Sequence, residues 1–166
     1  GCGSDTVQYF QWRKGRGAAE QFHGAIIDHL GRDDTRVFKE VSEVGELLKK
    51  LSPVTGSKVT SKVAILFDWS NRWAISDMQG MARDTKNYEK EVRKFYNIHL
   101  KKGISADIVF PLEDLSKYSL VVLPMYYAVS EEAGAWLKEY VKNGGTVVAT
   151  YLTAYVNENT LAYLGG

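Results

Sequence analysis

Val63-Ala64-Ile65-Leu66-Phe67 is an unbroken run of apolar residues, which is typical of a β-strand covered on both faces. Three more stretches have the composition of strands: residues 106–110, 120–123 and 146–151. Helical patterns lie between strands over about residues 84–101 and over 131–142, where Ser130 is the expected cap. Strands alternating with helices favour parallel neighbours, so we expect an open, mostly parallel α/β sheet of the flavodoxin-like, doubly wound kind.

Residues 1–52 do not follow this alternation. Residues 7–12 are rich in β-branched and aromatic side chains and predict one strand. In residues 35–51 the apolar side chains recur three and four positions apart, which predicts an amphipathic helix capped by Asp34 or Thr35. A single strand–loop–helix unit cannot bury its own apolar face, so we expect it to pack on a larger structure or on a partner chain.

The stretch Ser52-Pro53-Val54-Thr55-Gly56-Ser57 interrupts the helical pattern and marks the domain boundary that we expect. It divides the chain into residues 1–57 and residues 58–166. The first part then holds the single strand–loop–helix unit, and the second holds the whole pattern of alternating strands and helices.

Composition excludes several kinds of partner and cofactor. The 21 Lys and Arg residues nearly balance the 20 Asp and Glu residues, for a net charge of +1, which argues against a nucleic-acid partner. No apolar run approaches the roughly 20 residues that a membrane span needs. Cys2 is the only cysteine, and no set of Cys and His ligands exists, so we expect neither a disulfide nor a metal or other cofactor.

The carboxyl ends of the strands are where open α/β sheets bind ligands. No Gly-rich phosphate loop follows the first strand, and no Gly-x-Cys-x-Gly or Gly-x-Ser-x-Gly turn follows the third, so we expect the sheet domain to be non-catalytic. Aromatic residues follow the strands, and either a contact surface or ordinary packing accounts for them. They are Trp69, Trp73, Tyr126, Tyr127, Tyr151 and Tyr155.

The loop near the start of the chain holds a Glu-x-x-His pattern at Glu20 and His23. This spacing places both side chains on one face if the segment is helical. A metal site would need a second such pattern, which the sequence lacks. Beside Trp12 the pair could hydrogen-bond sugar hydroxyls, but taken alone these residues favour a structural contact over a sugar site.

Several stretches closely resemble glycoside hydrolase family 42 β-galactosidases. Those similar to the end of the family's catalytic barrel are Asp5–Arg13, Arg16-Gly17, Glu20–Gly24 and Thr35–Phe38. Those similar to the trimerisation domain that follows it are Val63–Trp69, Asp114–Tyr118, Leu120–Tyr126 and Asn143–Thr146. In the family, the fold of this second domain is like that of the class I glutamine amidotransferases.

The resemblance implies that residues 1–57 are the last βα unit of a (β/α)8 barrel and that residues 58–166 are a trimerisation domain. It also implies that Glu20 and His23 contact hydroxyls of the galactosyl unit. The family's retaining mechanism uses two carboxylates, and no acid in this chain matches either. We therefore expect no catalytic residue here and no activity from this chain alone, within a homotrimeric enzyme that hydrolyses terminal β-D-galactosides.

The ends, Gly1-Cys2-Gly3-Ser4 and Leu164-Gly165-Gly166, lead us to expect a piece of a longer protein. We also expect a cytoplasmic location for that protein. Two alternatives stay open. One is a stand-alone flavodoxin-like module that binds a small molecule, which titration with FMN, nucleotides and galactose would test. The other is an amidotransferase-like enzyme, which glutamine hydrolysis dependent on Cys2 would support.

Overall fold

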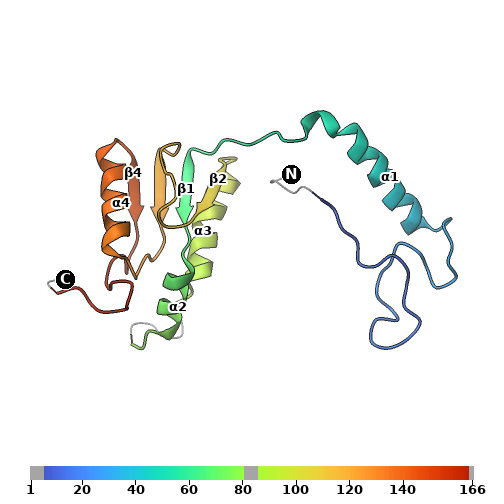
Figure 1. Ribbon diagram of the computed structural model, residues 1–166, viewed down its shortest axis with the longest axis horizontal. Helices are drawn as coiled ribbons and strands as arrows, with labels where there is room; N and C mark the ends of the chain where they lie inside the picture. Colours follow the sequence, from blue (N-terminus) through green and yellow to red (C-terminus); the bar gives the residue numbers. More distant parts are fainter. Residues whose placement is uncertain (1–5, 81–85, 165–166) are drawn as a thin grey trace. The chain divides into compact units, whose positions relative to one another are not determined.

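The computed structural model describes residues 6–80 and 86–164. The chain forms two compact units, which we call unit 1 (Gly1–Val59) and unit 2 (Thr60–Gly166). Unit 1 contains one α-helix, whereas unit 2 contains every strand of the described residues (Figure 1).

Unit 2 is built on a four-stranded parallel sheet. Its strands are β1 (Val63–Leu66), β2 (Ala106–Val109), β3 (Leu120–Leu123) and β4 (Thr146–Ala149). Their order across the sheet is β2-β1-β3-β4, and every neighbouring pair is parallel. The prediction of a mostly parallel α/β sheet is therefore confirmed, although three of the four strands end one or two residues before their predicted ends.

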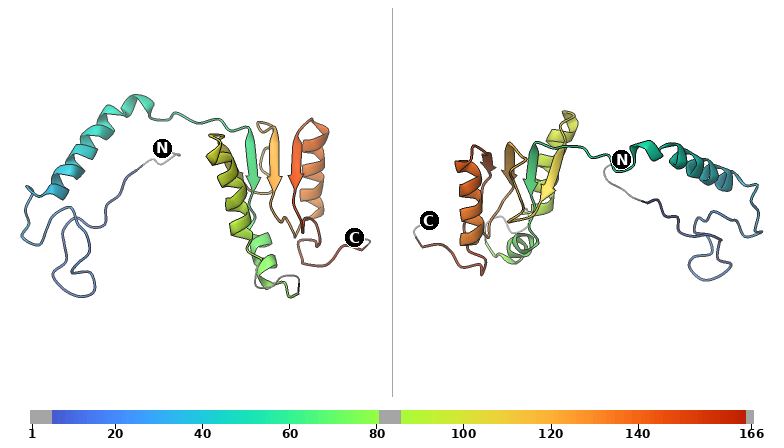
Figure 2. Two further views of the ribbon diagram at one scale, coloured as in Figure 1. Left: turned by 180° about the vertical axis from the view of Figure 1, so that it is seen from behind. Right: turned by 45° about the horizontal axis from the view of Figure 1, so that its top comes forward.

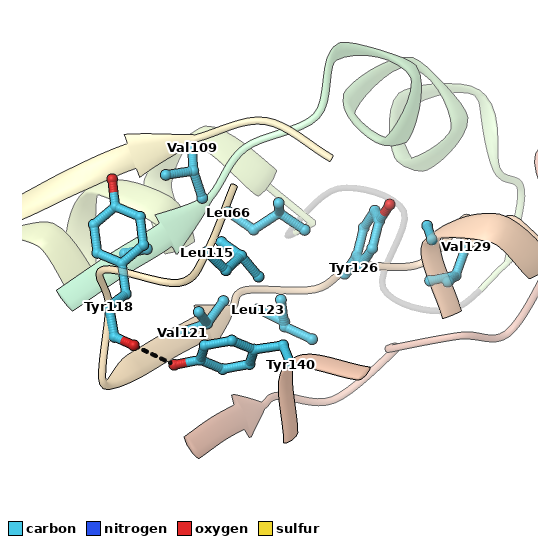
Figure 3. Close-up of a cluster of buried hydrophobic side chains, with 11 residues drawn as sticks. Leu66, Val109, Leu115, Tyr118, Val121, Leu123, Tyr126, Val129 and Tyr140 are labelled. Carbon is cyan, nitrogen blue, oxygen red and sulfur yellow. Dashed lines mark hydrogen bonds between the residues drawn. The ribbon is translucent and has the colours of Figure 1, made fainter. Parts of the chain in front are cut away.

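Three helices cover the two faces of this sheet. They are α2 (Trp69–Asp77), α3 (Tyr88–Lys101) and α4 (Glu131–Lys142). Successive side chains of a strand point to opposite faces, so Leu66 packs with α4 residues whereas Ile65 packs with α2 and α3 residues. Figure 2 shows α3 and α4 on opposite sides of the strands, and Figure 3 shows the cluster on the α4 side.

The helix ends follow from local capping. The predicted cap Ser130 accepts a hydrogen bond from the Ala133 amide, which confirms the start of α4. The Asn87 side chain accepts from the Lys90 amide, so α3 begins at Tyr88 rather than near residue 84. Positions 84 and 85 of that prediction lie outside the described residues.

The helix α2 was not predicted. Asp68, which lies two residues after the end of β1, caps it by accepting a hydrogen bond from the Ser70 amide at 2.9 Å. An Asp directly before the first helical residue is a helix-start signal that could have located it. Only Asn71 and Ile75 of this helix are buried, so its apolar residues form no clear stripe.

In unit 1, the predicted helix is confirmed as α1 (Arg36–Lys50), with Thr35 as its cap. A 3-10 turn, η1 (Ser52–Val54), follows it. No residue of α1 is buried, so its apolar stripe has no cover within the described part of unit 1.

The strand predicted over residues 7–12 is wrong, because residues 6–12 form no strand. The Ile26 and Ile27 amides donate to the carbonyls of Gln11 and Trp12 in this segment, at 3.0 and 2.8 Å. Composition can favour an extended chain, but a strand also needs neighbours on its edges, and the described residues offer this segment only one short partner.

Candidate functional site

The turn that follows β3 forms the centre of the carboxyl edge of the sheet. Asn71, which is fully buried in α2, holds this turn through three hydrogen bonds. Its Nδ2 donates to the Met125 carbonyl at 2.9 Å, and its Oδ1 accepts from the Tyr127 and Ala128 amides at 2.7 and 3.0 Å. A side chain of α2 therefore fixes the conformation of a turn more than 50 residues further along the chain.

Met125 occupies the tightest point of this turn. It has a positive φ of 44°, which is uncommon for a residue with a Cβ. Its amide donates to Thr150 Oγ1 at 2.8 Å, which ties the turn to the end of β4. Enzymes with a nucleophile on a strand-to-helix turn use a strained position of this kind, but a methionine thioether is no nucleophile of that chemistry.

Aromatic side chains surround the end of β1, in a group that we call the aromatic edge: Phe67, Trp69, Trp73 and Phe110. The Phe67 ring lies 4.9 Å from the Trp69 ring and 6.4 Å from the Phe110 ring, between centroids, and Trp69 and Trp73 are 6.4 Å apart. Trp69 and Trp73 are 51% and 60% exposed. The guanidinium of Arg72 lies over Trp69 and also pairs with Glu89, which holds this surface in place.

The structure divides the six aromatic residues that follow the strands. Tyr126 is buried in the core and Tyr127 is half-buried, as ordinary packing requires. The other four are exposed, as a contact surface would require: Trp69, Trp73, Tyr151 and Tyr155. The sequence did not reveal how deeply the aromatic residues after β3 are buried, because their burial follows from the turn at Met125.

Two tyrosines at this edge have perturbed acidity. Burial raises the pKa of Tyr88 to about 12, although its hydroxyl accepts a hydrogen bond from the Asp68 amide at 3.0 Å. Burial also raises the pKa of Tyr126, and the negative charge of Asp68 adds to this effect. Both phenols are therefore neutral at physiological pH, and Tyr88 also serves as a hydrogen-bonding group.

The Glu20 and His23 side chains lie in a surface loop of unit 1. The segment is a turn rather than a helix, and the His23 amide donates to the Glu20 carbonyl at 3.0 Å. Both residues are exposed, and the His23 ring meets the Phe10 ring edge-on at 6.4 Å between centroids. Trp12 is exposed as well. The role of the pair in binding a sugar stays a prediction.

Other residues, which the sequence left without roles, hold this loop together. The His29 ring lies within hydrogen-bonding distance of the Gly15 carbonyl, at 2.9 Å, and Arg13 donates to the His29 carbonyl at 3.3 Å. Arg32 donates to Asp28 at 2.6 and 2.8 Å, and this contact lowers the pKa of the Asp28 carboxyl. These bonds give the loop a defined shape around Glu20 without using its side chain.

Within residues 6–80 and 86–164, no group of three or more His, Cys, Asp or Glu side chains could hold a metal ion. No helix in the same ranges is long and apolar enough to cross a membrane. Cys2, on which the amidotransferase-like alternative depends, lies outside the described residues.

Unit 2 is thus an α/β domain with a parallel sheet and an exposed aromatic edge. Two family profiles match the chain: one described as the β-galactosidase trimerisation domain over residues 61–166, and one described as β-galactosidase, of glycoside hydrolase family 42, over residues 1–51. The chain belongs to the family 42 β-galactosidases, and residues 61–166 are the trimerisation domain of that family.

Individual relatives agree with this assignment. The chain is 50% identical over 164 residues to β-galactosidase Pbg of Clostridium perfringens and 47% identical to β-galactosidase GalA of Bacillus licheniformis, and it covers 24% of each. The solved structure of Gan42B, a family 42 β-galactosidase from G. stearothermophilus, superposes on 98% of the chain with a TM-score of 0.91 at 50% identity. The β-galactosidase of Bacillus circulans sp. alkalophilus superposes with a TM-score of 0.92 at 41% identity.

The chain spans about a quarter of the length of these relatives, 24% in each case, although it is matched almost from end to end.

Proposed function

We propose that the chain acts as part of a β-galactosidase, in which unit 2 holds copies of the protein together as a homotrimer. The match of residues 61–166 to a trimerisation domain carries this proposal. The aromatic edge supports it, because exposed Trp and Tyr side chains are enriched where proteins associate. In a closed trimer the contact joins two different patches of neighbouring copies, and the three-fold rotation closes the ring.

We also infer that unit 2 has a flavodoxin-like fold similar to that of the class I glutamine amidotransferases. The order β2-β1-β3-β4 supports this, because it is the order of the first four strands in flavodoxin-like sheets. Unit 1 is the last βα unit of a (β/α)8 barrel in this account. The uncovered apolar stripe of α1 supports that assignment, since such a helix packs on further strands and helices.

Glu20 and His23 contribute to the galactose subsite in the same proposal. A carboxylate accepts hydrogen bonds from sugar hydroxyls, and an imidazole can donate or accept one. Neither side chain is hydrogen-bonded or ion-paired within the described part of the chain, so both are available to a ligand. The exposed ring of Trp12 in the same loop offers an apolar face for a sugar ring.

The two catalytic carboxylates of the family lie outside this chain in our proposal. A retaining mechanism needs an acid/base and a nucleophile about 5–5.5 Å apart. No acid here matches either position, so we expect terminal β-D-galactosides to be hydrolysed with retention only by a protein that includes the rest of the barrel. The chain alone should not hydrolyse a chromogenic β-galactoside.

A tryptophan substitution tests the role of the aromatic edge. Sedimentation velocity would compare the wild-type chain with Trp69→Ala, and with Ile98→Ala as a control for loss of an exposed apolar side chain on α3. We expect Trp69→Ala to shift the distribution toward monomer and Ile98→Ala to leave it unchanged. Equal distributions for all three proteins would contradict an interface at this edge.

A further inference from the structure

A pocket of about 520 Å³ lies at the carboxyl edge of the sheet in unit 2. Residues from the whole length of α2, from the turn after β3 and from the segment 158–160 line it. It therefore occupies the position at which open α/β sheets bind small molecules. Of the four residues of the aromatic edge only Trp73 lines this pocket, and the galactose-binding role uses none of its residues.

The charged side chains that line the pocket are all acidic within the described part of the chain. Asp68, Asp77 and Glu158 line it, and among residues 6–80 and 86–164 no Lys, Arg or His side chain does. Within residues 6–80 and 86–164, none of these three carboxylates forms an ion pair. They are also not close enough together to hold a metal ion between them. Unpaired carboxylates spread around a recess favour a cation larger than a metal ion.

Tyr126 gives independent evidence for a ligand. The residue is only 2% exposed, it lines the pocket, and its hydroxyl makes no hydrogen bond within the described residues. Figure 3 shows this hydroxyl at the end of the ring that points away from Leu123 and Tyr140, whose side chains form the core. The hydroxyl oxygen keeps contact with solvent, so it can accept a hydrogen bond from a ligand that donates an N–H.

Trp73 completes the arrangement. Its ring lines the pocket and is 60% exposed. An indole face attracts ammonium groups and also packs against methylene chains. The pocket therefore combines an aromatic face, separate carboxylates and a free phenol oxygen, which are the groups that recognise an alkylammonium compound.

We propose that this pocket binds a small organic cation of the alkylammonium class. Asp68 and Glu158 attract the ammonium group, and Tyr126 Oη accepts a hydrogen bond from one of its N–H groups. Trp73 covers the hydrocarbon part. This binding site is separate from the galactose subsite of unit 1, and it needs no residue outside unit 2.

Putrescine and butanediol are suitable probes, because they have the same four-carbon chain and differ in charge. An NMR titration of the labelled 166-residue chain at low salt would follow its backbone amide signals. We expect saturable shifts with putrescine, concentrated at the residues around the pocket, and none with butanediol. Added salt should weaken the binding, because it screens the carboxylates.

Two variants test the assigned contacts, and a third is the control. We expect Glu158→Gln and Tyr126→Phe each to weaken putrescine binding about three- to tenfold, as the loss of one polar contact does. Tyr126→Phe should keep its thermal stability, because the hydroxyl has no partner in the protein. Glu43→Gln, an exposed change in unit 1, should leave the affinity unchanged.

The proposal is overturned if putrescine causes no saturable shifts, or if butanediol binds as tightly as putrescine. It is also overturned if Glu43→Gln weakens binding as much as Glu158→Gln does, because the attraction would then be a property of net charge. None of these outcomes bears on trimerisation, which is measured as molecular mass.

Discussion

Asn71→Ala should destabilise unit 2 more than any surface change in the same helices. The substitution removes three hydrogen bonds, to the Met125 carbonyl and to the Tyr127 and Ala128 amides. At about 1 kcal/mol for each bond, the loss in free energy of unfolding is about 3 kcal/mol. The Ala128 amide also becomes a buried donor without its partner, which adds to the cost.

Urea unfolding followed by circular dichroism measures this loss directly. For a unit of this size we expect the midpoint of thermal unfolding to fall by about 12–24 °C. Asn97→Ala on the exposed face of α3 is the matched control and should change stability by less than about 0.5 kcal/mol. If the two variants lose the same free energy, Asn71 does not hold the turn and our account of this edge is wrong.

Three further predictions concern the packing of unit 2, its stability at alkaline pH and the sugar subsite. A Cβ at Gly145 would lie 2.2 Å from Cζ of the buried Tyr140 ring, so Gly145→Ala should cost about 1–3 kcal/mol. Gly134→Ala, inside α4 with open space around it, should instead stabilise by about 0.5–1 kcal/mol in the same unfolding assay. The pKa of Tyr88 is raised from 10.0 to about 12, so its stabilising contribution is present below pH 10 and is lost as the pH rises to 12. The wild-type chain should therefore lose more stability than Tyr88→Phe over that interval, and equal losses would contradict the burial argument. In a longer β-galactosidase that contains this chain, His23→Ala should lower kcat/KM by the equivalent of about 1–3 kcal/mol. An unchanged kcat/KM would remove His23 from the subsite.

The central strands β1 and β3 of unit 2 could be predicted because their burial is recorded in their apolar composition. Residues 63–66 are apolar at every position because helices cover both faces of β1. The edge strand β4 was also recognised, although it is largely exposed, because its β-branched residues follow a clear helix stop at Asn143-Gly144-Gly145.

The helix α2 and the missing strand of unit 1 show where such reasoning stops. Only two residues of α2 are buried, so periodicity carries little signal, and its start depends on one side chain, Asp68. Residues 7–12 have the composition of a strand, but a strand forms only where neighbouring strands accept its hydrogen bonds. Composition reports the preference of a segment and not the presence of its partners.

The candidate sites were predictable in position but not in detail. Aromatic residues after the strands could be placed at the carboxyl edge, because parallel strands all end there. That Tyr126 turns inward depends on the turn at Met125, whereas Trp69 and Trp73 are exposed on α2. That turn is held by Asn71 through backbone groups 54 to 57 positions away, which no local pattern reveals.

Sedimentation equilibrium of the wild-type chain tests the central claim, that unit 2 assembles copies of this protein, most directly. One copy has a mass of 18.6 kDa, so three copies have a mass of 3 × 18.6 = 55.8 kDa. We predict that the measured mass approaches 55.8 kDa as the protein concentration rises. A mass that stays at 18.6 kDa at every concentration would contradict the claim.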